Sequence, residues 1–276
     1  MKKMSQPIYA CFDITNRCNL ECKHCIFKGE VKELTTEQVK EKLDWLDNNH
    51  FFSVQLAGGE PTVREDFEEI VRYAASKKFA LSLATNGTLL TDEKITLLKE
   101  CDFRLVQLSI DGNRPENDSL RGSGTFDLIN DALDKLIDAE IPVGVATMIT
   151  KKNKEHISEL VSYLGKKKIK YLRLQKIIKN NILEDVDVVT FIKVYEQAKM
   201  YAKENNIDIN INLPCYISEE IMYSLCEEVF IDILPNGRTQ SCFVEKNCYQ
   251  KFIPIEEVTE IPNTYNGKYY VCSRVI

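Results

Sequence analysis

The sequence predicts an α/β protein in which six strand–helix units form an open, partial (β/α)6 barrel of the TIM type, followed by a small C-terminal domain. Short apolar, β-prone runs alternate with amphipathic stretches up to residue 176. Such alternation favours parallel strands joined by right-handed crossovers. A closed barrel would need eight units. From about Pro214 onward the pattern changes to short apolar runs, turns and cysteines, which indicates a second domain.

The predicted strands are runs rich in apolar and β-branched residues, at 8–14, 52–56, 81–84, 105–110, 143–149 and 171–176. The predicted helices have apolar residues at helical spacing, at 36–48, 65–76, 92–100, 126–139 and 154–164. Thr91 and Asn153 precede two of these helices as candidate N-caps. After the sixth strand we predict a helix at 188–204 and, from strict alternation of apolar and polar residues, a strand at 207–213.

The loop after the first predicted strand has three cysteines at a spacing typical of metal ligands: Cys18, Cys22 and Cys25 follow a C-x3-C-x2-C pattern. Four cysteines fill a cubane [4Fe–4S] cluster, so three leave one iron open to a small molecule. Structural zinc is an alternative, although zinc usually takes paired C-x2-C units and four ligands. A disulfide between two of these cysteines is a third interpretation, and the lack of a secretory signal disfavours it.

This loop resembles that of the radical S-adenosylmethionine (SAM) enzymes, in which an aromatic-like residue precedes the third cysteine; His24 stands there. Further matches follow in the family's order, and the resemblance covers about residues 8–178. Three of them end the second, third and fourth predicted strands, and the last opens the following helix. They are Gly58-Gly59-Glu60-Pro61, Thr85-Asn86-Gly87, Ser109-Ile110-Asp111-Gly112 and Arg121-Gly122-Ser123-Gly124-Thr125-Phe126.

The resemblance implies a [4Fe–4S] cluster on Cys18, Cys22 and Cys25, with SAM bound to the open iron. Reductive cleavage of SAM would give a 5′-deoxyadenosyl radical that abstracts hydrogen from a substrate. The strand ends that carry the matches are where barrel active sites are built. The cofactor-binding residues implied by the resemblance are His24, Gly58, Gly59, Glu60, Asn86, Ser109, Asp111 and Arg121.

These matches also have structural explanations. Gly58 and Gly59 would let backbone approach the SAM amino group without a Cβ clash, or would simply form a turn between strand and helix. Ser109 and Asp111 would bind the ribose or methionine part of SAM, or would be polar strand ends. Arg121 would pair with a carboxylate of SAM or substrate, or cap a loop.

The C-terminal part contains a second candidate metal site. Cys226 and Cys242 flank an apolar run ending in Pro-Asn-Gly237, which is a hairpin signal. This layout resembles the SPASM and twitch extensions of radical SAM enzymes, and implies an auxiliary [4Fe–4S] cluster, with Cys248 and Cys272 as further ligands. One cluster, as in the twitch form, fits the cysteine count. Structural zinc and unliganded thiols are the alternatives.

The expected domains are a barrel at 1–180, a connecting helix and strand at 181–213, and a twitch-like auxiliary-cluster domain at 214–276. Cys215 is a substitute ligand, a hydrogen-donating thiol or a core residue. The net charge of −6 argues against broad nucleic-acid binding, and no apolar run is long enough to span a membrane. Ten cysteines without a signal peptide indicate a cytoplasmic protein that uses metal.

The expected function is radical SAM modification of a peptide or protein, such as cross-linking or epimerisation during ribosomal peptide maturation. The alternative is radical oxidation or rearrangement of a small molecule, for example an amino sugar or a nucleotide. A non-catalytic iron–sulfur electron carrier is a third hypothesis, disfavoured because a carrier needs no SAM-binding residues. The expected partners are the substrate and a reductant such as flavodoxin or ferredoxin. No residue is assigned to the chemistry of the substrate itself.

Overall fold

The computed structural model describes residues 9–25, 32–177, 185–212, 216–218, 230–237, 239–240, 252–254 and 269–272. Strands and helices alternate through the larger part of these residues. In chain order they are β1 (Tyr9–Thr15), α1 (Thr36–Asn48), β2 (Ser53–Gly58), the short 3-10 helix η1 (Pro61–Val63), α2 (Phe67–Ala75), β3 (Ala80–Thr85), α3 (Asp92–Glu100), β4 (Leu105–Ser109), α4 (Arg114–Arg121), α5 (Thr125–Asp138), β5 (Val143–Ile149), α6 (Ile157–Lys166), β6 (Tyr171–Lys176), α7 (Val188–Glu204) and β7 (Asp208–Asn212).

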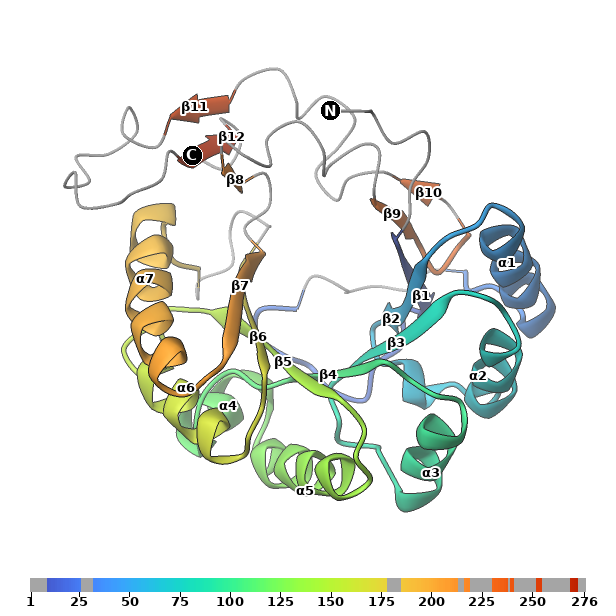
Figure 1. Cartoon of the computed structure of the whole chain (residues 1–276), viewed down its shortest axis with the longest axis horizontal. Helices are drawn as coiled ribbons and strands as arrows, with labels where there is room; N and C mark the ends of the chain where they lie inside the picture. Colours follow the sequence, from blue (N-terminus) through green and yellow to red (C-terminus); the bar gives the residue numbers. More distant parts are fainter. Residues whose placement is uncertain are drawn as a thin grey trace.

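Five short strands follow in the C-terminal part: β8 (Tyr216–Ser218), β9 (Phe230–Ile233), β10 (Thr239–Gln240), β11 (Phe252–Pro254) and β12 (Tyr269–Cys272). Within the described residues, the main sheet has nine strands in the order β10-β9-β1-β2-β3-β4-β5-β6-β7, and β11-β12-β8 form a separate sheet. Figure 1 shows β1 to β7 as an open arc with the helices along its outer side. The predicted open, partial barrel is therefore confirmed.

The six predicted barrel strands all form, and they pair as parallel neighbours. The predicted strand at 207–213 also joins this sheet, as β7, parallel to β6. Thr91 caps α3 as predicted, because its side chain accepts a hydrogen bond from the Lys94 amide. Asn153 does not cap the next helix; α6 begins later, after His156.

Helix α4 was not predicted from the sequence. It is a short, highly polar helix with Pro115 in its first turn, so it lacks the apolar periodicity on which the other predictions rest. Its presence changes the role of the segment from Arg121 to Phe126. Arg121 ends α4 and α5 begins at Thr125, so the segment opens α5 as predicted and also joins it to α4.

The predicted C-terminal hairpin is confirmed. β9 and β10 pair antiparallel, and the Gly237 amide donates to the Leu234 carbonyl across the turn (2.8 Å). Gly237 has a φ of 79°, which favours glycine. β9 also pairs in parallel with β1, and the Leu34 amide donates to the Pro235 carbonyl (2.9 Å). The hairpin thus extends the barrel sheet beyond β1.

The two faces of the barrel strands differ in chemistry. Alternate residues of a strand point to opposite faces. One set, which includes Phe12, Leu56, Leu83 and Leu108, is buried in the hydrophobic core that the helices cover. The other set faces the inside of the arc, which we call the lumen, and is largely polar. From β1 to β6 its polar members include Tyr9, Asp13, Gln55, Ser82, Gln107, Ser109, Arg173 and Gln175.

Within the part of the chain that the structure describes, no helix combines the length and apolar character needed to cross a membrane.

The end of β1 is fixed by a buried guanidinium. Arg64 donates from Nη1 to the carbonyls of Ile14 (2.7 Å) and Leu34 (3.2 Å), and it contacts both carboxylate oxygens of Asp66 (2.7 and 2.8 Å). The hydrogen bonds from Arg64, aided by one from Thr36, lower the pKa of Asp66 to about 2 although partial burial opposes this. Arg64 therefore joins β1, the start of α1 and the start of α2.

Replacing Arg64 with Met is expected to lower the free energy of unfolding by about 3 kcal/mol, because Asp66 loses its cation and the carbonyls of Ile14 and Leu34 lose this donor. Urea unfolding followed by circular dichroism measures the change. The control is Arg72→Met, which removes the exposed pairs with Glu68 and Glu100 and should cost less than about 1 kcal/mol. Equal losses of stability in both variants would show that the buried contacts of Arg64 do not stabilise the fold.

The buried Asp13 carboxyl makes stability depend on pH. Burial raises its pKa from 3.8 to about 7. The folded state therefore holds a proton that the unfolded state releases, so stability is full below pH 4 and falls as the pH rises to 7. At pH 8, Asp13→Asn should raise the free energy of unfolding by at most about 4 kcal/mol, with little effect at pH 4. Urea titrations at both pH values test this; an equal effect at both would contradict it.

Candidate functional site

The three cysteines of the predicted cluster loop lie at the end of the barrel where β1 finishes. Cys22 is buried, whereas Cys18 and Cys25 are partly exposed. Burial raises the pKa of the Cys22 thiol to about 11; Arg121 opposes the rise, whereas Asp111, Cys25 and Cys18 add to it. The three thiols are therefore close enough to interact electrostatically. Thiolates are the ligands of iron–sulfur clusters, and bound iron keeps them deprotonated, so this donor set fits the implied cluster.

The start of this loop is held by Glu33. Its Oε1 accepts hydrogen bonds from the Thr15 hydroxyl (2.6 Å) and from the amides of Asn16 (2.8 Å) and Arg17 (3.2 Å). Its Oε2 pairs with Arg17 Nε at 3.2 Å. Partial burial opposes ionisation of Glu33, but the hydrogen bonds from Thr15, Asn16 and Arg17 outweigh it and lower its pKa. A charged carboxylate thus fixes the direction in which the chain leaves β1.

The end of β2 packs tightly against the same loop. The Gly59 amide donates to the Thr15 carbonyl (2.9 Å) and the Glu60 amide to the Arg17 carbonyl (2.8 Å). A Cβ at Gly58 would lie 2.2 Å from the Thr15 oxygen, and one at Gly59 would lie 2.3 Å from the Arg17 oxygen. The two glycines therefore have a structural requirement separate from the expected approach to SAM: any side chain there would displace the cysteine loop.

Glu60 links the end of β2 to the end of β3. Its carboxylate is fully buried and accepts four hydrogen bonds. The donors are the Thr62 amide (3.1 Å) and hydroxyl (2.6 Å), the Thr85 hydroxyl (2.8 Å) and the Asn86 amide (2.6 Å). Because both carboxylate oxygens are occupied by protein donors, Glu60 acts here as a support that positions Asn86.

Asn86 in turn contacts the cysteine loop. Its Nδ2 donates to Asn19 Oδ1 (2.9 Å) and lies 3.8 Å from Cys18 Sγ, while its Oδ1 accepts from the Thr88 amide and hydroxyl. The Leu20 amide also points at Cys18 Sγ, at 3.4 Å. Donors around a ligand sulfur stabilise its thiolate and tune a bound cluster.

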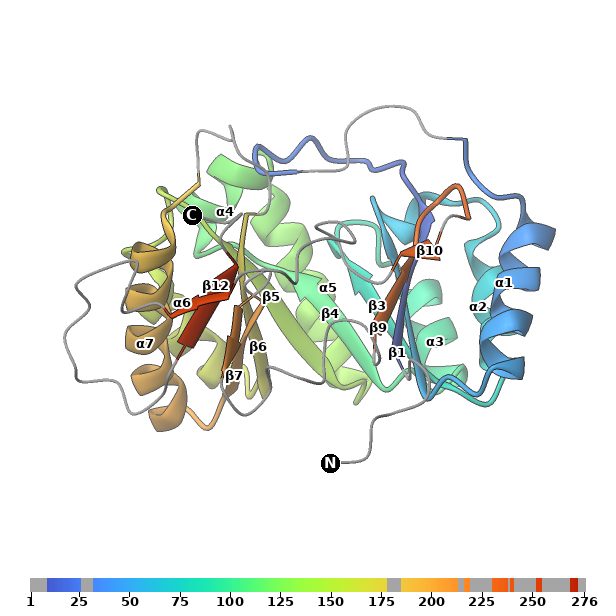
Figure 2. The same cartoon turned by 90° about the horizontal axis from the view of Figure 1, so that it is seen from above.

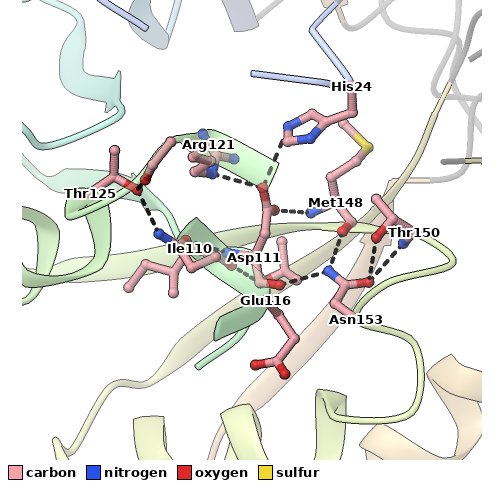
Figure 3. A network of polar contacts seen from close by, with 12 residues as sticks. His24, Ile110, Asp111, Glu116, Arg121, Thr125, Met148, Thr150 and Asn153 are labelled. Atoms are coloured by element: carbon pink, nitrogen blue, oxygen red, sulfur yellow. Dashed lines mark hydrogen bonds and ion pairs between the residues drawn. The ribbon is translucent and has the colours of Figure 1, made fainter. Parts of the chain in front are cut away.

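Asp111 is the centre of a second polar group at the end of β4, shown in Figure 3. The residue is fully buried. Its Oδ2 forms an ion pair with Arg121 Nε (2.7 Å) and lies 3.4 Å from His24 Nε2, while its Oδ1 accepts from the Met148 amide (2.8 Å). The structure thus brings together His24, Asp111 and Arg121, which lie far apart in the sequence.

Helix α4 places Arg121 and connects it to the loop. The Lys23 amide donates to the Leu120 carbonyl (2.9 Å), and the Asp111 amide donates to Asn117 Oδ1 (3.1 Å). Figure 2 shows the loop after β1 crossing this end of the barrel toward α4. Two successive residues of α4, Leu120 and Arg121, therefore face the loop and the Asp111 carboxylate.

Asn153 is a site-supporting residue that the sequence analysis assigned to another role. Its Nδ2 donates to the carbonyls of Asp111 and Met148 (both 2.7 Å), and its Oδ1 accepts from the Thr150 amide (2.7 Å). The residue is fully buried. Its position just after the fifth predicted strand was a usable signal, because the other site residues also follow strand ends.

The remaining predicted site residues are less constrained. Ser109 lies at the end of β4 opposite Ala146, and no side-chain contact within the described residues defines its role. Cys272 ends β12, opposite Phe252. Cys215, Cys226, Cys242 and Cys248 lie outside the described residues. Among the described residues, no three histidine, cysteine or carboxylate side chains surround a position for a single metal ion.

Comparison with known proteins gives a consistent result. Residues 12–164 match the family profile described as the Radical SAM superfamily. The chain is 36% identical over 164 residues to mycofactocin maturase MftC of Mycolicibacterium smegmatis. The matched region is 58% of this chain and 42% of that protein. It is also 36% identical over 172 residues to Fe-coproporphyrin III synthase of Methanosarcina barkeri. That matched region is 60% of this chain and 43% of the relative. The chain thus matches less than half of the length of either relative.

The fold is similar to that of Streptococcus suis SuiB, with a TM-score of 0.76 and 20% identity over 90% of this chain and 63% of that one. SuiB has also been crystallised with S-adenosylmethionine and with the precursor peptide SuiA. This likeness concerns the fold.

Replacing Glu33 with Ala is expected to weaken retention of a reconstituted cluster, because the loop loses four contacts at its start. Iron should be lost to a chelator about tenfold faster, the lower range for loss of a supporting contact at a metal site. The loss is followed by absorbance under anaerobic conditions. Glu37→Ala, an exposed residue in the first turn of α1, is the matched control. Equal iron loss in both variants would contradict a role for Glu33 in holding the loop.

Proposed function

Because this chain belongs to the radical SAM superfamily, we propose that it is a peptide-modifying enzyme of that family. The proposal is carried by the 36% identity over 164 residues to a protein named as a maturase. The match to the family profile, at residues 12–164, includes the cysteine loop and the strand-end motifs. The family implies a [4Fe–4S] cluster and SAM. When bound, they supply an electron and a 5′-deoxyadenosyl radical that abstracts hydrogen from the substrate.

In this proposal each residue of the site has a defined task. The thiolates of Cys18, Cys22 and Cys25 bind the cluster. The Asn86 amide, beside Cys18, orients and stabilises a ligand sulfur. Arg121 provides positive charge near Cys22 and Cys25, and Asp111 holds that guanidinium in place.

The other cofactor-binding residues of the proposal are assigned to SAM by the resemblance alone. His24 lies directly before a proposed cluster ligand, with its Nε2 3.4 Å from Asp111 Oδ2. Gly58 and Gly59 have no side chain, so their backbone can lie directly against the cysteine loop. Glu60 accepts a hydrogen bond from the Asn86 amide and so orients the turn after β3. Ser109 is the last residue of β4.

We also propose an auxiliary [4Fe–4S] cluster, with Cys226, Cys242, Cys248 and Cys272 as ligands in a twitch-like domain at 214–276. The support is the β9–β10 hairpin, which falls between Cys226 and Cys242 and pairs with β1. β1 also leads into the cysteine loop. The hairpin of the proposed second cluster and the loop of the first would therefore both adjoin β1. The barrel at 1–180 and the connection at 181–213 complete the proposed division.

A small molecule is the second candidate substrate, because one relative of equal identity is named as Fe-coproporphyrin III synthase. The proposed reductant is a flavodoxin or ferredoxin, since the cluster must receive electrons. We propose no nucleic-acid or membrane partner and a cytoplasmic location, in line with the net charge and the cysteine content.

Anaerobic reconstitution with iron and sulfide tests the catalytic proposal. The protein should bind about eight irons per chain with both clusters, or about four without the auxiliary one. With dithionite and SAM it should form 5′-deoxyadenosine, and Cys22→Ala should abolish this product because a cluster ligand is lost. Cys101→Ala, remote from the loop and at the end of α3, is the control. No 5′-deoxyadenosine from fully loaded protein would support an electron carrier instead.

The peptide proposal is tested separately, with synthetic copies of short peptides encoded beside the gene. Mass spectrometry should detect loss of a hydrogen pair for a cross-link, or uptake of solvent deuterium for an epimerisation. If no peptide changes while a porphyrin or an amino sugar does, the small-molecule candidate replaces the peptide.

A further inference from the structure

The lumen contains a carboxyl group that the proposed chemistry does not use. Asp13 lies on β1, on the face opposite the core residues Phe12 and Ile14, and is only 3% exposed. Among the described residues its Oδ2 has no hydrogen-bond partner. Its Oδ1 has the Cys11 thiol at 4.0 Å, which is a weak donor. The carboxyl is therefore buried but left largely unsatisfied by the protein.

Such a group is costly to keep. A buried polar atom without a partner lowers stability, and native proteins contain few of them. Burial is the cause of the raised pKa of Asp13, and no cation among the described residues offsets it. At the same end of the barrel, Glu60 accepts four hydrogen bonds. The Asp111 Oδ2 atom also lacks a well-aligned hydrogen bond, but it has the Arg121 guanidinium as an ion-pair partner at 2.7 Å. Asp13 differs from both, because its Oδ2 has neither a hydrogen bond nor an ion pair among the described residues.

The surroundings of Asp13 suit a small polar group. Its partner in register on β2 is Ala57, so the adjacent strand places only a methyl group beside it. The lumen-facing Gln55, Ser82 and Gln107 on the next strands are also buried, at 7%, 8% and 8% exposure. Asp13 itself is five residues before the first cysteine of the loop, so it lies below the proposed radical site rather than at the far end of the barrel.

We propose that Asp13 is a substrate-binding residue that accepts hydrogen bonds from a protonated amine held inside the barrel. A protonated amine supplies both the donors and the positive charge that this carboxylate lacks, and charge-assisted hydrogen bonds are the strong ones. Of the described lumen-facing strand residues from β1 to β6, the other charged one is Arg173, on β6 at the opposite side of the arc. The assignment of the amine to a lysine side chain or an N-terminus rests on the proposed peptide function. The proposal that Asp13 binds an amine does not depend on that function.

The test is selection of peptides by the reconstituted holoenzyme with SAM. An mRNA-displayed library of random peptides is captured on wild-type protein, on Asp13→Asn, and on Tyr9→Phe. Tyr9 is a control on the same face of β1, and its hydroxyl contacts Gln55 rather than Asp13. Iron content and substrate-free formation of 5′-deoxyadenosine confirm that each variant is folded and loaded. Asp13→Ser is the second variant if the amide disturbs the fold.

Wild-type protein and Tyr9→Phe should enrich peptides that carry an amine at a fixed position, and Asp13→Asn should bind those peptides at least about tenfold more weakly. N-acetylation of the selected amine should give the same loss in wild-type protein and no further loss in Asp13→Asn. If Asp13→Asn binds the same peptides equally well, the role of Asp13 is overturned and the peptide function is untouched.

If wild-type protein captures no peptide, the peptide function fails, and two small amines decide the role of Asp13. Putrescine and glucosamine are then titrated against wild-type protein and Asp13→Asn, with thermal unfolding as the measurement. Stabilisation of wild-type protein alone supports the amine site in the barrel. Equal stabilisation of both proteins, or of neither, overturns it.

Discussion

The contact between the cysteine loop and the Gly58-Gly59 turn is the constraint on which the rest of the site depends. The carbonyls of Thr15 and Arg17 come so close to this turn that a Cβ at either glycine would overlap them. Two backbone hydrogen bonds close the contact, and Glu33 and Arg64 hold the chain on either side of it. With the start of the loop fixed in this way, its three cysteines project over the end of the barrel rather than away from it.

Two buried carboxylates then connect the strand ends to this loop, and they do so in different ways. Glu60 is surrounded by neutral donors and sets the turn that presents Asn86 to Cys18. Asp111 is paired with a cation and so keeps Arg121 beside Cys22. The first arrangement fixes geometry, whereas the second also places positive charge where cluster thiolates would carry negative charge. Both depend on parallel strands whose carboxyl ends meet at one edge.

The lumen of this barrel differs from the packed interior of a closed one. A closed barrel fills its inside with branched apolar side chains. Here the inward positions include Gln55, Ser82 and Gln107, and the apolar residues are on the helix side. The inner face of this open arc is therefore polar and largely buried. Asp13 is the position at which this difference has an energetic cost, since its Oδ2 is buried and has no hydrogen-bond partner among the described residues.

The barrel strands, the hairpin and the cysteine loop could be predicted from the sequence, because strand periodicity, turn residues and short motifs are local signals. The residues at the strand ends could also be predicted. How these residues combine is visible only in the folded chain. The tertiary structure paired Asp111 with Arg121 and His24, gave Asn153 a bridging role in place of a helix cap, and revealed α4, whose polar surface carries no periodic signal. Contacts between residues far apart in the chain depend on how strands align side by side, and no local pattern records that alignment.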